Sequence, residues 1–233
     1  MAIFANERNW NSGFERNFMR VVLGGTFDPV HLGHLRIATE LASALNVEHL
    51  YLMPCYQAVH KAEVGAACQH RLKMLQLALA GDPCLRLDER EILRSRASFT
   101  IDSLLELRAE LNQEPLCLVI GTDAAQGFTR WHRVAEFASI THLVVVQRGG
   151  LTSSVNWSEF IDLGFQQTDN LRSLSESPAG KVVSVSVNRL EISSSYIRNC
   201  IRKGQSIRYL VTDAVRSYIV DNGLYLAGNE RLY

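Results

Sequence analysis

The sequence has no apolar run long enough to cross a membrane, and its first residues lack the hydrophobic core of a signal peptide. It also has no excess of basic charge: 24 Lys and Arg residues balance 24 Asp and Glu residues, so the formal net charge is zero. Domains that bind nucleic acid usually show a basic excess. These absences exclude a membrane-spanning protein and argue against nucleic acid or a membrane as partner.

Cysteine is sparse and scattered. The five cysteines are odd in number and contain no Cys-x-x-Cys pair, so they form neither a disulfide framework nor a zinc cage. Reduced thiols are typical of a cytoplasmic protein, which is the location we expect. No internal repeat is present, and 233 residues can bury the core of one large domain.

The N-terminal segment, residues 1–18, is polar and rich in Asn, Arg and Glu. We expect it to be a flexible tail that precedes a single domain at residues 19–233. Because Met19 stands directly before the first apolar run, we hypothesise that the functional unit can begin there. Residues 151–180 have weak periodicity and are expected to form a variable excursion, with a short helix at 157–163.

Apolar runs and helical periodicities alternate along the rest of the chain. The runs predict strands at 21–23, 49–53, 85–87, 116–120, 143–146 and 182–187. The periodicities predict helices at 35–45, 72–79, 100–111, 131–137, 194–202 and 213–221, with Ser98 or Thr100 capping the third. This alternation predicts an α/β fold, a doubly wound parallel Rossmann-like sheet with C-terminal helices.

Ligands of such sheets bind beyond the carboxyl ends of the strands. Gly24, Pro54, Gly121 and Arg148 all fall where a predicted strand ends, so the residues near them should converge on one cleft.

The most informative stretch is residues 24–36, Gly-Gly-Thr-Phe-Asp-Pro-Val-His-Leu-Gly-His-Leu-Arg. A glycine-rich turn here joins a predicted strand to a helix that begins with two histidines. The first-turn amides of a helix lack partners within it and favour an anion, so the stretch predicts a phosphate site. Two histidines three residues apart could also bind a metal or simply begin a helix, but the surrounding residues favour phosphate. The residues of this predicted phosphate site are Gly24, Gly25, Thr26, Phe27, His31, Gly33 and His34.

A second phosphate-binding element is predicted at residues 192–198, Ile-Ser-Ser-Ser-Tyr-Ile-Arg. Ser193, Ser194 and Ser195 can cap the free amides of a helix and donate their hydroxyls to phosphate. Arg198 lies one turn further, and its planar fork of donors matches phosphate oxygens. Taken alone, the stretch would be an ordinary capped surface helix.

Taken together, these motifs resemble the signature of the nucleotidyltransferase superfamily. Further matches are His60-Lys61 after the second strand, residues 98–104 (Ser-Phe-Thr-Ile-Asp-Ser-Leu), and Ile-Gly-Thr-Asp at 120–123 followed by Trp131. Two further matches lie near the end of the chain, Tyr218-Ile219 and Leu224-Tyr225, so the resemblance runs from about residue 21 to 225. It is most similar to the bacterial nicotinate-mononucleotide adenylyltransferases.

This resemblance implies adenylyl transfer from ATP to nicotinate mononucleotide, giving deamido-NAD and pyrophosphate in NAD biosynthesis. The small-molecule partners would be ATP, with Mg²⁺, and nicotinate mononucleotide. The catalytic residues would be His31, His34, Lys61 and Arg198. The residues that bind the substrate would be Ser98, Phe99, Thr100, Gly121, Asp123, Trp131 and Arg148.

The expected Mg²⁺ is carried mainly by the phosphates and has no dedicated metal site. Asp123 or Asp28 would lie nearby, and Asp28 could equally cap a turn beside Pro29.

The chain departs from the family pattern at three places. Val59 and Thr212 replace prolines, and Phe99 replaces a tyrosine. The first change should leave the loop of Lys61 freer in the unbound chain, because proline restricts the backbone.

Other functions stay open at this point. A related transferase could act on nicotinamide mononucleotide or on phosphopantetheine. From different classes, a non-enzymatic nucleotide sensor or a metallohydrolase using His31, His34 and Asp28 would share some of these residues. The sequence leaves the oligomeric state open, a homo-oligomer included.

Overall fold

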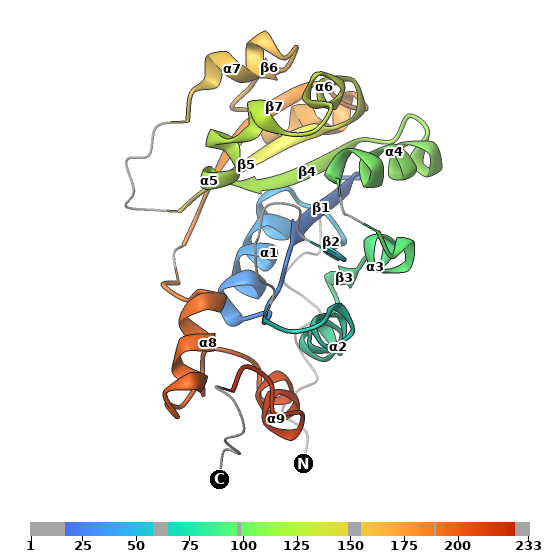
Figure 1. Ribbon diagram of the computed structural model, residues 1–233. Helices are drawn as coiled ribbons and strands as arrows, with labels where there is room; N and C mark the ends of the chain where they lie inside the picture. Colours follow the sequence, from blue (N-terminus) through green and yellow to red (C-terminus); the bar gives the residue numbers. More distant parts are fainter. Residues whose placement is uncertain (1–16, 58–64, 97–98, 149–154, 189, 227–233) are drawn as a thin grey trace, which may run out of the picture.

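The computed structural model describes residues 17–57, 65–96, 99–148, 155–188 and 190–226. Its centre is a seven-stranded sheet in the order β3-β2-β1-β4-β5-β7-β6, in which every neighbouring pair is parallel. Figure 1 shows helices on both sides of this sheet. The strands are β1 (Arg20–Gly25), β2 (Leu50–Pro54), β3 (Leu85–Leu87), β4 (Leu116–Gly121), β5 (His142–Arg148), β6 (Gln166–Gln167) and β7 (Lys181–Val187).

The strand order reverses direction at β1. Val21 is paired with Leu50 of β2 on one side and with Cys117 of β4 on the other. Crossovers leave a parallel sheet in opposite directions at such a point, which opens a crevice beyond the carboxyl ends of the strands. The loop after β1 therefore lies where a ligand is expected.

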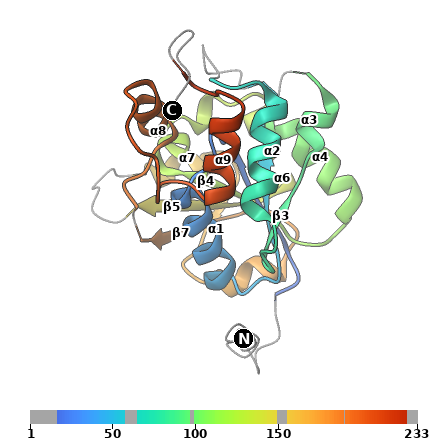
Figure 2. The ribbon, with the colours of Figure 1, turned by 90° about the horizontal axis from the view of Figure 1, so that it is seen from below.

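Alternate residues of the central strands point into two hydrophobic cores. Val21 lies in the core beneath α1, α2, α8 and α9, whereas Val22 lies in the core beneath α4, α6 and α7. Figure 2 shows α9 beside α2, which it contacts. The helices are α1 (Leu32–Ala44), α2 (Cys68–Leu79), α3 (Arg90–Arg94), α4 (Thr100–Leu111), α5 (Thr122–Gln126), α6 (Phe137–Ile140), α7 (Trp157–Asp162), α8 (Ser194–Arg202) and α9 (Asp213–Asp221).

The doubly wound parallel fold is confirmed, and each predicted strand lies within about a residue or two of its observed bounds. The predicted helix at 131–137 is wrong. Trp131 is extended at the end of a short 3-10 turn, and Arg133 has a left-handed φ of 54°, which an α-helix does not accommodate. The α-helix starts only at Phe137. Helices α3 and α5 have five residues each and were not predicted, because a single turn carries too little periodicity.

Helix α4 also begins differently from expectation. Its N-cap is Phe99, which makes no side-chain capping bond, and Thr100 is its first helical residue. Thr100 therefore does not cap the helix, and Ser98 lies outside the described residues. By contrast, Thr212 caps α9: its hydroxyl accepts a hydrogen bond from the Val215 N–H at 3.3 Å. The departure from proline at this position thus supplies a cap.

The ends of the predicted domain carry contacts of their own. Asn17, in the expected tail, donates from its side chain to the Leu45 carbonyl at 2.7 Å and from its backbone to Asn46 at 2.8 Å. Asn17 thus contacts the domain two residues before Met19, and the earlier part of the tail lies outside the described residues. In the expected excursion, α7 is confirmed and Phe160 is buried.

All five cysteines are free thiols. Among the helices that the structure describes, none combines the length and the apolar character that a membrane crossing requires.

Candidate active site

The two histidines lie at the start of α1, directly beyond β1. His31 is the N-cap, with an extended backbone, and its N–H donates to Nδ1 of His34 at 3.3 Å. The two rings stack with centroids 3.7 Å apart. Because Nδ1 of His34 accepts a hydrogen bond, the ring proton belongs on Nε2, which makes Nε2 a donor. The local fold thus selects the tautomer that can bind an anion.

A cavity of about 310 Å³ extends from these histidines to α8. Gly33 forms part of its wall, and a Cβ atom there would lie 3.0 Å from Nδ1 of His31, so glycine allows the imidazole to pack against the helix. The cavity is lined by Thr26, Phe27, Asp28, His31, Gly33, His34, Ile37, Asn188, Leu190, Ile192, Ser193, Ser194, Ser195 and Arg198.

The three serines at the start of α8 do different things. Ser193 is the cap and accepts from the N–H of Tyr196 at 3.1 Å. The Ser194 hydroxyl donates to the Pro29 carbonyl at 2.9 Å, which ties α8 to the loop after β1. Ser195 accepts from Nη2 of Arg198 at 3.3 Å. The two motifs predicted from the sequence therefore meet at one cavity.

Asp28 is buried and hydrogen-bonded in the loop after β1. It is 4% exposed, and its carboxylate accepts from the N–H groups of Gly65 and Ala66 at 2.7 and 3.1 Å. The Tyr225 hydroxyl donates to the same carboxylate at 2.8 Å. Asp28 was expected either near Mg²⁺ or in a structural role beside Pro29, and these contacts favour the structural role.

A second cavity, of about 260 Å³, lies between the start of α4 and the segment after α5, at the same edge of the sheet. Trp131 packs against Phe128 and Phe137 with ring centroids 5.2 and 5.7 Å away. The ring centroids of Phe99 and His132 are 4.5 Å apart. The residues that line this second cavity are Phe99, Thr100, Ile101, Ala124, Trp131, His132 and Phe137.

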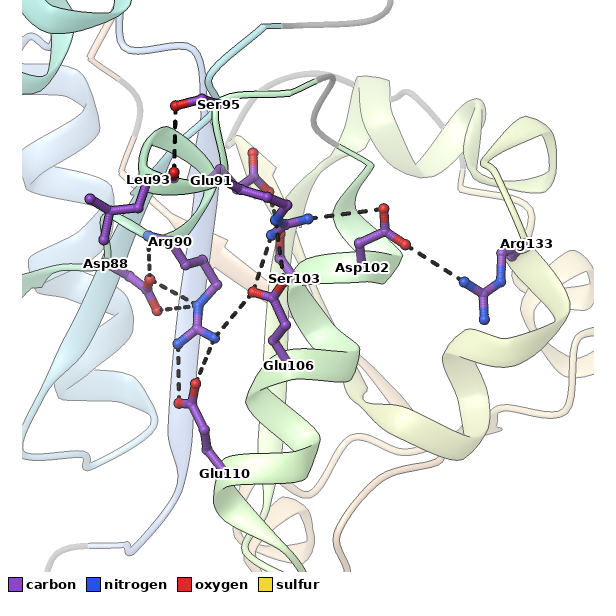
Figure 3. A network of polar contacts seen from close by, with 11 residues as sticks. Asp88, Arg90, Glu91, Leu93, Ser95, Asp102, Ser103, Glu106, Glu110 and Arg133 are labelled. Atoms are coloured by element: carbon purple, nitrogen blue, oxygen red, sulfur yellow. Dashed lines mark hydrogen bonds and ion pairs between the residues drawn. The ribbon is translucent and has the colours of Figure 1, made fainter.

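A network of ion pairs, drawn in Figure 3, connects α3 to α4 and ends near the second cavity. Arg94 lies 4.0 Å from Asp102 and 3.2 Å from Glu106, and Arg133 lies 3.6 Å from Asp102. Two guanidinium groups therefore offset the charge of Asp102, which would otherwise repel an anion at the first turn of α4.

Other predicted site residues stand apart from these cavities. Four of them line neither cavity: Gly24, Gly25, Gly121 and Asp123. These four, and the backbone of Arg148, lie at or directly after the carboxyl end of β1, β4 or β5, as expected. Lys61, with its neighbours Val59 and His60, lies outside the described residues, as does Ser98.

Sequence reasoning missed three residues that line the first cavity: Ile37, Asn188 and Leu190. Ile37 belongs to the same helix as the histidines, which was an available signal. Leu190 and Asn188 carried none, because they follow β7 in an irregular segment.

Within the described ranges, no three His, Cys, Asp or Glu side chains are arranged to hold a metal ion. The stacked rings of His31 and His34 do not converge with Asp28, whose oxygens are already bonded. This geometry does not fit the metallohydrolase alternative.

Comparison with known proteins gives a consistent result. Residues 22–200 match the model of the cytidylyltransferase-like family. A protein of Marinobacter nauticus named "Probable nicotinate-nucleotide adenylyltransferase" is 43% identical over 209 residues, which cover 89% of this chain and 96% of the relative. A Cellvibrio japonicus protein of the same name is also 43% identical, over 91% of this chain and 97% of the relative.

Among solved structures, the nicotinic acid mononucleotide adenylyltransferase of Plasmodium falciparum, complexed with NaAD, superposes with a TM-score of 0.67. It is 16% identical and the match covers 89% of this chain and 97% of that one, so the likeness supports the fold. From the family match and the extent of identity with these relatives, the chain belongs to the cytidylyltransferase-like family and, within it, to the nicotinate-nucleotide adenylyltransferases.

Proposed function

We propose that this protein transfers the adenylyl group of ATP to nicotinate mononucleotide, giving deamido-NAD and pyrophosphate. The observation that carries the proposal is the cavity in which the start of α1, with His31 and His34, meets the start of α8, with Ser195 and Arg198. Two helix N-termini and a guanidinium form a site for a chain of phosphates. Relatives about 40% identical carry the name of this activity.

The reaction needs positioning and charge neutralisation more than proton transfer. An oxygen of the mononucleotide phosphate forms a bond to the α-phosphorus of ATP, and the bond from that phosphorus to the bridging oxygen of pyrophosphate breaks. The nucleophile is already an anion, so it needs no strong base. The site must bring two anions together and stabilise the charge that develops on the transferred group.

The residues that line the first cavity share this work. His34, with its proton on Nε2, donates to the phosphates, and His31 holds that ring by its backbone N–H and by stacking. Arg198 lines the same cavity and holds the leaving pyrophosphate. The apolar side chains of Ile37, Leu190 and Ile192 provide a surface for adenine.

The second cavity is suited to the pyridine ring. Trp131 offers an aromatic face, and the first-turn amides of α4 near Thr100 favour the ring carboxylate. Arg94 and Arg133 support this by offsetting Asp102. An amide in place of the carboxylate would lose the charge that these groups favour, which supports nicotinate over nicotinamide mononucleotide.

Mg²⁺ is proposed to enter with its substrate, as Mg-ATP, because the described residues provide no dedicated cage. Asp123, exposed in the first turn of α5, is the carboxylate that could contact its water shell. Lys61 is proposed as a second cation for pyrophosphate on the strength of its motif alone. A cytoplasmic location is proposed because ATP and reduced thiols are found there.

The test is the identity and stoichiometry of the products. We expect Mg-ATP and nicotinate mononucleotide to give deamido-NAD and pyrophosphate in equal amounts, measured by mass spectrometry and a coupled pyrophosphate assay. Release of phosphate with ADP would contradict adenylyl transfer. Binding of ATP without any product, from folded protein, would favour the nucleotide sensor.

A further inference from the structure

The two phosphate-binding helices of the first cavity are connected through one buried carboxylate, that of Asp28. It belongs to the loop between β1 and α1, yet it contacts Arg198 of α8 by both its backbone and its side chain. We propose that Asp28 is a positioning residue, which fixes the Arg198 guanidinium for the phosphates of ATP. The inference rests on the proposed function, in which Arg198 binds those phosphates.

The contacts of Arg198 hold its guanidinium in one orientation. Nη1 donates to the Asp28 carbonyl at 2.6 Å and lies 3.5 Å from Oδ2 of the same residue. Nη2 donates to Ser195 at 3.3 Å. Among the residues that the structure describes, Nε donates to none, and the side chain keeps 23% of its surface exposed. The Asp28 contacts thus take up one terminal nitrogen and leave other donors for a ligand.

The Asp28 carboxylate is itself held by several donors. The Asp28 side chain is 5% exposed, and it accepts hydrogen bonds from three groups other than Arg198: the Gly65 and Ala66 N–H groups and the Tyr225 hydroxyl. A buried carboxylate with several donors stays in place, so a cation that pairs with it is also held in place. Burial, then the charge and the hydrogen bond of Asp28, raise the pKa of Tyr225 above its ordinary value, which keeps that hydroxyl a donor.

Steric packing adds to this arrangement. A Cβ atom at Gly65 would lie 2.8 Å from Cδ of Arg198 and 2.9 Å from Cε1 of Tyr225. The stem of Arg198 and the Tyr225 ring therefore press against the backbone of Gly65, whose N–H bonds to Asp28. Backbone, tyrosine and carboxylate together restrict the rotamers of Arg198.

Restriction of this kind matters because a free arginine side chain loses much rotamer freedom when it binds a ligand. An arginine that is already oriented loses less rotamer freedom, so its binding to phosphate has a lower entropic cost and a higher affinity. Ser194 reinforces the same junction by its bond to the Pro29 carbonyl.

The experiment is a double-mutant cycle of Asp28→Asn and Arg198→Ala, with the dissociation constant of Mg-ATP measured by calorimetry. We expect Asp28→Asn alone to raise this constant about tenfold, a loss of about 1.4 kcal/mol in binding free energy. In the Arg198→Ala background, the same change should raise it less than about twofold. The KM for nicotinate mononucleotide should change little, because its proposed pocket lies elsewhere.

Equal losses in both backgrounds would overturn the proposal, since Asp28 would then act on the fold and not through Arg198. It would also be overturned if Arg198→Ala left the affinity for Mg-ATP unchanged. If Asp28→Asn does not fold, Tyr225→Phe takes its place, with an expected twofold to threefold rise that disappears in the Arg198→Ala background. Failure of the proposed function would be seen separately, as intact binding of Mg-ATP without dinucleotide product.

Discussion

At the scale of single residues, the chemistry of the site depends on how backbone groups orient side chains. The His31 N–H fixes the tautomer of His34, and the Asp28 carbonyl holds Arg198. The motifs alone predicted which residue types would meet. They did not predict these bonds, because a hydrogen bond from the backbone of one motif to a side chain of another depends on the folded positions of both.

The first prediction concerns His34. Replacing it with alanine should lower kcat by about 10²–10³, the usual cost of removing one preorganised donor. The matched control is His49→Ala, which lies just before β2 at the opposite edge of the sheet and should leave kcat within about twofold. A loss below about threefold in His34→Ala would count against its role.

A second residue-scale prediction concerns stability against pH. His142 is fully buried, its Nδ1 accepts from the Lys181 N–H at 3.0 Å, and its Nε2 donates to the Ser177 carbonyl at 2.8 Å. Burial, with smaller contributions from the charges of Lys181 and Arg108, lowers the pKa of His142. The unfolded chain, with a pKa of about 6.5, therefore binds this proton more readily than the folded chain.

The stabilisation is complete above about pH 6.5 and is lost as the pH falls toward the lower folded-state pKa. We expect the free energy of unfolding, from urea titration, to fall between about pH 7.5 and about pH 5.5. In His142→Gln, which keeps a donor for Ser177 but does not titrate, the fall should be smaller. Parallel curves for the two proteins would contradict this account.

At the scale of elements, the sequence predicted strands well and short helices poorly. The strands carry continuous apolar runs because they are buried on both faces. In helix α2, predicted at 72–79, the buried residues are Met74, Leu75 and Leu79 together with Arg71, which precedes the predicted range. A hydrophobic pattern alone does not predict that an arginine such as Arg71 is buried on the apolar face of a helix.

Arg71 holds two loops by their carbonyl groups. It is 1% exposed, Nη1 donates to Thr26 and Nη2 to Tyr56, both at 2.7 Å. We expect Arg71→Met to lower the free energy of unfolding by about 2–4 kcal/mol, because two bonds from a buried guanidinium to part-buried carbonyls would be lost. Lys73→Met, on the exposed face of the same helix, should change it by less than about 0.5 kcal/mol. Similar urea midpoints for both variants would disprove the role of Arg71.

The candidate site was predictable where a motif carried it. Both phosphate motifs meet as expected, and Phe99, Thr100 and Trp131 line one cavity. The part of Asn188 and Leu190 in the first cavity was not predictable, because they come from a segment without periodicity that only the folded sheet brings beside α1.

At the scale of the whole molecule, the order of the strands decides where chemistry happens. The reversal between β1 and β4 places the loops after both strands at one edge of the sheet. The alternation of strands and helices predicted a parallel sheet but not this order, which depends on long-range pairing.

The N-terminal tail gives a prediction at this scale. Deletion of residues 1–18, so that the chain begins at Met19, should leave a folded and active protein. Loss of the two Asn17 bonds should lower the free energy of unfolding by about 1–3 kcal/mol. Deletion of residues 1–16, which keeps Asn17, is the control and should match the full chain. Loss of folding in the shorter protein would show that Met19 cannot begin the functional unit.

Adenylyl transfer to an acceptor that carries a pyridine carboxylate can be tested by the kcat/KM for pyrophosphate release from Mg-ATP, measured with nicotinate and with nicotinamide mononucleotide. We expect a strong preference for the acid, because the start of α4 favours a negative charge. Equal values would contradict the assignment of the second cavity, and no release with either acceptor would contradict the function itself.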